Sequence, residues 1–357
     1  MKRLERIRAE MESRNLARFL VSSQFNVRYL SGFTGDTGWL IVEPGTANLI
    51  TDFRYEEQAS REVYPGVNVV IDKRDVLSAA CDALAPVQGR IGFEAAALTF
   101  AAYEKLAGVV IAELMGLAAL VESHRKVKDG EELAALTRAC AASDAVFAEI
   151  VKEMKPGMTE IDLAARIDYL LRRRSTDVPP FKTIVASGSN GSLPHATPSS
   201  RKIEKGDFVT MDLGASVDGY CSDLTRTVVM GRASDRQREI YGIVLEAQLK
   251  AEAGIKAGMK GSEADGLARE YIEGKGYGEN FGHSLGHGVG LEIHEEPRLS
   301  KKNDDPLEAG MVATVEPGIY IPGWGGVRIE DMAVVEEGRC RVLTAADKRL
   351  VEIGGAK

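Results

Sequence analysis

The chain has 357 residues, a formal charge of −8 at pH 7, 44% hydrophobic residues and 27% charged residues. This is the composition of a soluble globular protein, and the length exceeds what one core usually supports, so two domains are expected. The acidic balance argues against a nucleic-acid partner, and no apolar run approaches the roughly 20 residues that span a bilayer. Neither nucleic acid nor a membrane is therefore expected as a partner.

The cysteines and the first residues predict a cytoplasmic location. The four cysteines lie far apart without a CxxC pair, which is typical of reduced thiols in a cytosolic protein. The opening segment, MKRLERIRAEMESRN, is charged and is not followed by the apolar stretch of a secretory signal.

The first third of the chain alternates short strand patterns with helical patterns. GWLIVEP and ANLITD predict two strands on either side of the turn signal Pro44-Gly45. Further strands are predicted at 66–71 and 90–94, and helices at 55–63 and 99–110. These elements predict an α/β domain over residues 1–123, with its boundary in the charged segment ESHRKVKDGEEL.

The second domain, over residues 124–357, begins with a long helical pattern from Asp129 that Pro156-Gly157 closes. Thr159 then caps a second helix, with Asp162 as its capping-box partner. A similar pattern recurs in the second half of this domain, with Ser262 as the expected cap.

This recurrence predicts an internal repeat. Residues 154–171 resemble residues 255–272 when a two-residue insertion is allowed, and acidic strand pairs follow at 207–230 and 311–335. A repeat of this size indicates two half-domains related by a pseudo-two-fold axis, with a site where they meet. The alternative is that two helices share a generic pattern.

Four of the five histidines lie in two glycine-rich segments. His283, His287 and His294 lie within GHSLGHGVGLEIHEEPR, and His195 lies within SNGSLPHATPSS. Imidazole is the commonest neutral metal ligand and a near-neutral acid–base group, so this pattern indicates metal binding or proton transfer. His124, in the segment between the domains, is given no role.

Carboxylates occur at unusual places on predicted strands. Asp212 and Asp223 lie on opposite arms of a hairpin that turns at Asp218-Gly219, where they would repel each other unless a cation lay between them. Glu316 ends the apolar strand in VATVEPGIY.

In GVRIEDMAVV, Arg328 and Glu330 are two residues apart and share one face of a strand. The alternative to a metal site here is an ion pair between these two side chains, because a lone carboxylate would be expensive to bury in so apolar a strand.

Together these residues predict a metal centre of four carboxylates and one imidazole: Asp212, Asp223, His287, Glu316 and Glu330. The set is too anionic for one ion and suits two divalent cations about 3.5 Å apart, as in two-metal hydrolases. Mn²⁺, Co²⁺ and Zn²⁺ all fit oxygen and imidazole ligands, and Mn²⁺ or Co²⁺ is favoured.

The motif HSLGHGVGLEIHE (283–295) resembles the signature of the proline-specific metallopeptidases, Xaa-Pro dipeptidase (prolidase) and aminopeptidase P. MDLGASVDGYCSDLTRT, TVEPGIY and GVRIED resemble the other metal-site segments of that family, in the same order, and the resemblance covers nearly all of residues 125–345. It implies a pseudo-two-fold "pita-bread" catalytic domain, preceded by a creatinase-like N-terminal α/β domain.

The same resemblance implies roles for individual residues. Asp212 would chelate one metal, His287 and Glu316 the other, and Asp223 and Glu330 would bridge the two. Glu316 would also act as general base and then acid, with His294 stabilising the oxyanion and His195 positioning the amide or the leaving group. The substrate would contact His283, Arg298 and Arg328, although Arg298 could equally be a surface cation.

We therefore expect a cytoplasmic, dinuclear metallopeptidase, assembled as a homodimer, that hydrolyses the Xaa-Pro bond of dipeptides or short peptides. Xaa-Pro dipeptidase is favoured over Xaa-Pro aminopeptidase, because Arg298 could recognise a free carboxylate that directly follows proline. The competing hypotheses are a metal-free interaction module or pseudo-enzyme on the same fold, an amidinohydrolase of the creatinase type, and a methionine aminopeptidase.

Overall fold

The computed structural model describes residues 2–354. The chain divides into two compact units, which meet in the sequence between Arg125 and Lys126. Among the described residues, none of the helices combines the length and hydropathy that crossing a membrane requires.

The first unit is an α/β domain built on one six-stranded sheet in the order β4-β3-β2-β1-β5-β6. Strand β2 runs antiparallel to both of its neighbours, and the other pairings are parallel. Its strands are β1 (Arg18–Val21), β2 (Trp39–Val42), β3 (Ala47–Asp52), β4 (Val67–Asp72), β5 (Arg90–Glu94) and β6 (Glu113–Leu117). Its helices are α1 (Lys2–Ser13), α2 (Gln24–Ser31), η1 (Phe53–Tyr55), α3 (Glu56–Glu62), α4 (Val76–Leu84), α5 (Phe100–Ala107) and α6 (Glu122–Arg125).

Local sequence explains where several of these elements begin and end. Asp75 and Thr99 accept hydrogen bonds from backbone N–H groups in the first turns of α4 and α5, which is the usual N-cap interaction. The strands predicted at 38–44, 47–52, 66–71 and 90–94 and the helices predicted at 55–63 and 99–110 are all present. Six elements of this unit were not predicted from the sequence: α1, β1, α2, α4, β6 and α6.

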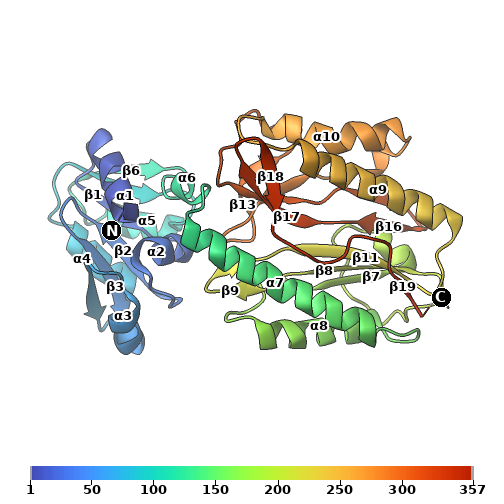
Figure 1. Ribbon diagram of the computed structural model, residues 1–357. Coiled ribbons are helices and arrows are strands. Elements are labelled where there is room, and N and C mark those ends of the chain that lie inside the picture. The colour runs from blue at the N-terminus through green and yellow to red at the C-terminus, as the bar shows by residue number, and fades with distance from the viewer. Residues whose placement is uncertain (1, 355–357) are drawn as a thin grey trace. The chain divides into compact units, whose positions relative to one another are not determined.

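The second unit places its sheets between two pairs of helices (Figure 1). The helices are α7 (Gly130–Glu153), α8 (Glu160–Arg174), α9 (Asp235–Gly254) and α10 (Gly261–Gly274), with short turns η2 (Gly188–Ser192) and η3 (Gly278–Asn280). Helix α7 begins after Asp129 and α8 after Thr159, and both have full capping boxes. Both predicted helix starts are therefore confirmed.

Two larger sheets and two hairpins make up the β-structure of the second unit. The four-stranded sheet has the order β19-β11-β8-β7, and the five-stranded sheet the order β13-β12-β14-β17-β18. The strands of the first are β7 (Ile184–Ser187), β8 (Phe208–Leu213), β11 (Leu224–Met230) and β19 (Glu352–Ile353). Those of the second are β12 (Gly286–Gly288), β13 (Glu295–Leu299), β14 (Val312–Val315), β17 (Asp331–Glu336) and β18 (Arg339–Val342). The hairpins pair β9 (Ser216–Val217) with β10 (Tyr220–Cys221), and β15 (Gly318–Ile321) with β16 (Gly325–Arg328).

The internal repeat is visible in matching backbone hydrogen bonds. The bond from Gly157 N to Ile203 O in the first repeat matches the bond from Gly258 N to Leu307 O in the second. In the same way, Glu160 N to Arg201 O matches Gly261 N to Asp305 O. The third match is Gly206 N to Met230 O with Gly310 N to Val335 O. The two halves of the second unit therefore share one backbone framework, as the sequence pattern predicted.

Two details of the predicted repeat are wrong. The helices α8 and α10 correspond without the two-residue insertion, because Glu160 and Gly261 occupy equivalent first positions. The residue preceding α10 is Lys260 rather than Ser262, and Glu263 accepts a hydrogen bond from the Lys260 backbone at 2.9 Å. Ser262 instead lies inside the first turn and donates to Asp304.

The hairpin turn at Asp218-Gly219 is present, with φ angles of 52° and 80° at its two central residues. These left-handed angles at both positions are those of the two-residue hairpin loop that Asp-Gly favours. Asp212 lies opposite Thr225, however, while Asp223 directly precedes β11. The two aspartates therefore lie on opposite arms without being cross-strand partners.

Candidate active site

All ten predicted site residues line one pocket of about 460 Å³ in the second unit. Its wall contains the five predicted metal ligands and the five predicted catalytic or substrate-binding residues: Asp212, Asp223, His287, Glu316 and Glu330, and His195, His283, His294, Arg298 and Arg328. Of these ten residues, the first repeat contributes His195 from the segment after η2, Asp212 from β8 and Asp223 just before β11, and the second repeat contributes the other seven. The pocket therefore lies where the two repeats meet.

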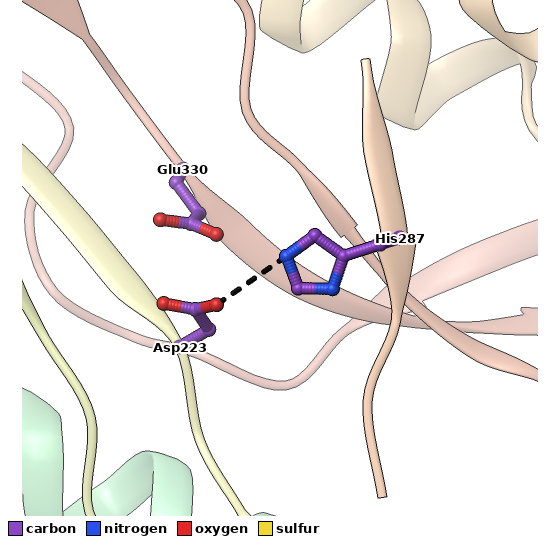
Figure 2. Close-up of side chains that lie close together, drawn as sticks. All are labelled: Asp223, His287 and Glu330. Carbon is purple, nitrogen blue, oxygen red and sulfur yellow. Dashed lines mark ion pairs between the residues drawn. The ribbon is translucent and has the colours of Figure 1, made fainter. Parts of the chain in front are cut away.

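Asp223, His287 and Glu330 form the tightest group in the pocket (Figure 2). One potential ligand atom of each lies within 4.8 Å of the others, and all three residues are buried. His287 Nε2 is 3.6 Å from Asp223 Oδ2 and 3.5 Å from Glu316 Oε1. The same imidazole nitrogen therefore faces two of the four carboxylates.

The glycines on either side of His287 allow this close arrangement. A Cβ atom on Gly286 would overlap the carbonyl of Thr314, and one on Gly288 would overlap the carbonyl of Glu296. The backbone of β12 can lie this close to its neighbours only because these positions have no side chain. The short strand thus holds the His287 ring against the carboxylates.

Threonine hydroxyls orient two of the carboxylates. Thr314 Oγ1 accepts from the His287 backbone N–H at 3.0 Å and donates to Glu316 Oε1 at 2.9 Å. Thr225 Oγ1, from the other repeat, donates to Glu330 Oε2 at 2.6 Å.

Arg328 connects several parts of the site and is itself 4% exposed. Its guanidinium donates to Asp212 Oδ2 at 2.6 Å, to Tyr320 Oη at 2.9 Å and to the carbonyl oxygen of Pro194 at 3.2 Å. The ion pair that the sequence suggested between Arg328 and Glu330 is therefore replaced by one with Asp212. The reason is that Glu330 faces Thr225, whose hydroxyl also accepts from Arg328 Nε at 3.0 Å.

The site concentrates negative charge away from water. Burial, reinforced by the charge of Glu330, raises the pKa of Asp223 well above its usual range. Burial, reinforced by Glu316, does the same to the pKa of Glu330. Burial also raises the pKa of Glu316 to about 7 and lowers the pKa of His287 to about 4. Burial disfavours the charged form of each group, which explains the raised pKa of the carboxyl groups and the lowered pKa of the imidazole, and the crowding of carboxylates adds to the rise at Asp223 and Glu330.

This donor set fits divalent cations. The pocket offers carboxylate oxygens and a neutral imidazole nitrogen, which are ligands that divalent cations such as Mn²⁺ and Zn²⁺ accept. Asp212 Oδ1 is buried without a hydrogen-bond partner among the described residues, and an orphaned carboxylate oxygen in such a position is unusual unless a cation binds it.

The remaining predicted residues surround this group. The rings of His287 and His294 lie 4.3 Å apart between centroids, and His294 is exposed to the pocket. His283 lies within hydrogen-bond distance of Tyr320 Oη, 3.0 Å from its Nε2. His195 and Arg298 are exposed in the pocket wall and are free to meet a ligand.

Sequence reasoning missed several residues that shape the pocket. Thr225 and Thr314 lie two residues from predicted ligands, so the two-residue period of a strand could have identified them. Tyr320 lies in the quoted segment TVEPGIY but was not singled out. Residues 181–184, which form another part of the wall, have no such signal in the sequence.

Comparison with known protein families decides the class of the protein. Residues 134–337 match the model of metallopeptidase family M24, and residues 3–127 match that of the creatinase/prolidase N-terminal domain. The chain belongs to metallopeptidase family M24. It is therefore a metallopeptidase, and membership of this family implies divalent metal ions.

Similar proteins extend over the whole chain. The chain is 37% identical to the Xaa-Pro dipeptidase of Pyrococcus furiosus, with 98% of this chain and 99% of that protein covered. A solved structure of an Xaa-Pro dipeptidase from Bacillus anthracis superposes with a TM-score of 0.94 at 43% identity, covering 98% of this chain and 99% of the other. An X-Pro aminopeptidase from Thermotoga maritima gives a TM-score of 0.91 at 36% identity, with 98% and 99% covered. The expected fold class, a creatinase-like domain followed by a pita-bread domain, is confirmed.

Proposed function

We propose that this M24 metallopeptidase hydrolyses the Xaa-Pro bond of dipeptides. The observation that carries the proposal is the meeting of four carboxylates and His287 in one pocket whose wall also holds the exposed cation Arg298. The similar proteins named Xaa-Pro dipeptidase, from Pyrococcus furiosus and Bacillus anthracis, support the choice of substrate.

Two divalent cations are proposed for the pocket, with Mn²⁺ or Co²⁺ favoured over Zn²⁺ because the ligand set is rich in oxygen and contains no thiolate. Asp212 would hold one cation, His287 and Glu316 the other, and Asp223 and Glu330 would contact both. When bound, the cations would polarise the scissile carbonyl and lower the pKa of water.

Glu316 is proposed as the group that moves the proton. Its carboxylate would take a proton from the attacking water and deliver it to the proline nitrogen that leaves. Its place in the pocket wall supports this assignment, because a general base must lie within reach of the proton that it takes. The hydrogen bond from Thr314 keeps Oε1 oriented toward His287.

Two histidines are proposed to act on the scissile amide. His294 would donate a hydrogen bond to the oxyanion that develops on the carbonyl oxygen, and His195 would position the amide or the leaving group. Both are exposed in the pocket wall, where a substrate could reach them. His283 and Arg328 complete the wall around the substrate, and Arg328 also holds Asp212.

Arg298 is proposed to bind the free carboxylate of the substrate. In an Xaa-Pro dipeptide this carboxylate directly follows the proline, and the planar guanidinium can donate to both of its oxygens. Aminopeptidase activity, which needs this end of the pocket open for more chain, is the second candidate. The similarity of this chain to the X-Pro aminopeptidase from Thermotoga maritima is the observation that supports this second candidate.

One assay separates the two candidates. Protein loaded with Mn²⁺ or Co²⁺ would be given an Xaa-Pro dipeptide, the same dipeptide with an amidated C-terminus, and an Xaa-Pro tripeptide. Strong preference for the free dipeptide would support a dipeptidase. Equal or faster cleavage of the other two substrates would favour an aminopeptidase, and cleavage of none of them would contradict the proposed function.

We also propose that the protein is a cytoplasmic homodimer with domains at residues 1–123 and 124–357. Four free cysteines, three of them buried, support a reducing compartment. None of the described residues of the first domain lines the pocket, which is consistent with a role in assembly for this domain. Limited proteolysis that releases two stable fragments would test the boundary.

A further inference from the structure

The carboxylate of Glu160 is completely buried at the start of α8, outside the pocket lining. Its Oε1 accepts from the backbone N–H of Ser187 at 2.7 Å and from the hydroxyl of Ser187 at 2.7 Å. Its Oε2 accepts from the backbone N–H of Ser199 at 3.0 Å and from the hydroxyl of Ser199 at 2.6 Å. The amide of Asn190 donates to both oxygens, at 3.2 and 3.1 Å.

Ser187 and Ser199 are the two ends of the segment that carries His195. The segment leaves β7, passes through η2 and then forms the pocket wall at residues 194–198. One carboxylate therefore ties the beginning of this loop to its end. Because the ends of such a compact loop lie close together, an anchor at its base restricts the whole loop.

The tip of the loop also touches the metal-site framework. The carbonyl of Pro194, the residue before His195, accepts from Arg328 at 3.2 Å. Arg328 in turn holds Asp212. A shift at the base of the loop would therefore move His195 relative to the carboxylates.

The repeat shows that this anchor is not part of the shared backbone framework. In the second half of the unit, the position equivalent to Glu160 is Gly261, as the matching hydrogen bonds to Arg201 and Asp305 show. The backbone framework of the repeat therefore does not require a side chain at this position, because the second repeat has glycine there. The carboxylate is present only in the repeat whose following segment carries His195.

We propose that Glu160 is a positioning residue for Xaa-Pro hydrolysis that acts through His195, an inference that rests on the proposed function. The carboxylate fixes both ends of the 187–199 segment and so fixes the distance of the imidazole from the scissile amide. Precise placement matters because a displacement of about 1 Å can reduce the rate roughly 10²-fold.

The first test is a double-mutant cycle with Glu160→Gln and His195→Ala. The glutamine side chain has nearly the same shape as the glutamate. Its NH2 group takes the place of one carboxylate oxygen and cannot accept hydrogen bonds from Ser187 or from Ser199, so one end of the loop loses its anchor. We expect Glu160→Gln alone to lower kcat roughly 10- to 100-fold with KM less affected and two metals retained. In the His195→Ala background the same substitution should have little further effect. An equal loss in both backgrounds, or no loss in the parent, would overturn the proposal.

Hydrogen–deuterium exchange tests the anchor without any substrate. Glu160→Gln should accelerate exchange within residues 187–199 and leave residues 281–287 unchanged. Asp265→Asn is the matched control, because this buried carboxylate on α10 instead accepts from the Leu285 backbone, at 2.9 Å. It should accelerate exchange at 281–287 only, and its effect on kcat should persist in the His195→Ala background.

Should Glu160→Gln fail to fold, Ser199→Ala removes one hydroxyl donor and should give a smaller, roughly threefold loss with the same dependence on His195. Unchanged exchange at 187–199 in both variants would overturn the proposal. If the parent cleaves none of the Xaa-Pro substrates, the proposed function fails, while the exchange experiment still reports whether Glu160 anchors the loop.

Discussion

Arg328 of the second repeat donates to Asp212 of the first repeat across 2.6 Å, and both side chains line the pocket. The guanidinium satisfies only Oδ2 and leaves the buried Oδ1 without a hydrogen-bond partner among the described residues. Asp212 is therefore oriented by a permanent positive charge while one oxygen remains available to a cation. The pair also joins the two repeats at the site they share.

The first prediction concerns metal content. Protein reconstituted with excess Mn²⁺ or Co²⁺ should contain close to two ions per chain by elemental analysis. Asp223→Ala or Glu330→Ala removes a shared ligand, so the ratio should fall well below two and activity should be lost. Glu94→Gln changes a buried carboxylate of the first unit and should keep both ions. Full activity at one ion per chain or fewer would contradict the dinuclear site.

The second prediction separates His294 from the metal ligands. His294→Ala should retain both metal ions and lower kcat by roughly 10²–10³, which is the effect of removing one oxyanion donor. His124→Ala, which changes a histidine outside the pocket lining, is the control and should leave kcat unchanged. A His294→Ala enzyme as active as the parent would show that this histidine does not contact the developing charge.

The third prediction tests carboxylate recognition by Arg298. Arg298→Ala should raise KM for an Xaa-Pro dipeptide by about tenfold or more, the loss expected when a charge-assisted hydrogen bond is removed. It should have little effect on KM for the amidated dipeptide. Lys182→Ala removes another exposed cation of the pocket wall and is the control for a general loss of positive charge. Equal effects of the two substitutions would argue against a specific contact with Arg298.

The fourth prediction concerns stability. The side chains of Arg226 and Asp331 are 1% and 0% exposed and lie 2.7 Å apart. Arg226→Met should lower the free energy of unfolding by about 3–5 kcal/mol, because it leaves a buried charge with fewer partners. Arg238→Met breaks an exposed pair with Glu352 and should cost less than about 1 kcal/mol. Urea unfolding followed by far-UV circular dichroism would compare the variants, and equal losses would contradict this difference.

The fifth prediction concerns assembly. Light scattering at micromolar concentration should give twice the mass of one 38.6 kDa chain. The mass of a single chain under these conditions would refute the proposed homodimer.

The sequence indicated which residues meet in the pocket better than it indicated what supports them. The five proposed carboxylate and imidazole ligands lie in motifs with strong local patterns, and the structure brings them all into one pocket. Glu160 could not be identified in this way, because its partners Ser187 and Ser199 are distant in sequence and appear ordinary on their own. The role of Arg328 was only partly predicted, since its neighbour Glu330 suggested an ion pair that the structure forms with Asp212.

Helix starts show the same limit on a smaller scale. Thr159 was predicted correctly because its hydroxyl and Asp162 form a complete capping box. Near the start of α10 the sequence offers Ser262 as the stronger cap former, yet the helix already begins at Gly261. The backbone bond from Gly261 to Asp305, which belongs to the framework of the repeat, determines this start and is invisible in a local pattern.

The division of ligands between two repeats determines when the site can first exist. Asp212 and Asp223 are synthesised roughly a hundred residues before Glu316 and Glu330, an interval on the order of ten seconds at about 5–20 residues per second. For most of that time the nascent chain carries only two of the five proposed ligands, and His287 is added before Glu316. The complete set of proposed ligands therefore exists only near the end of synthesis, and a chain truncated during translation before Glu316 lacks at least two of the five.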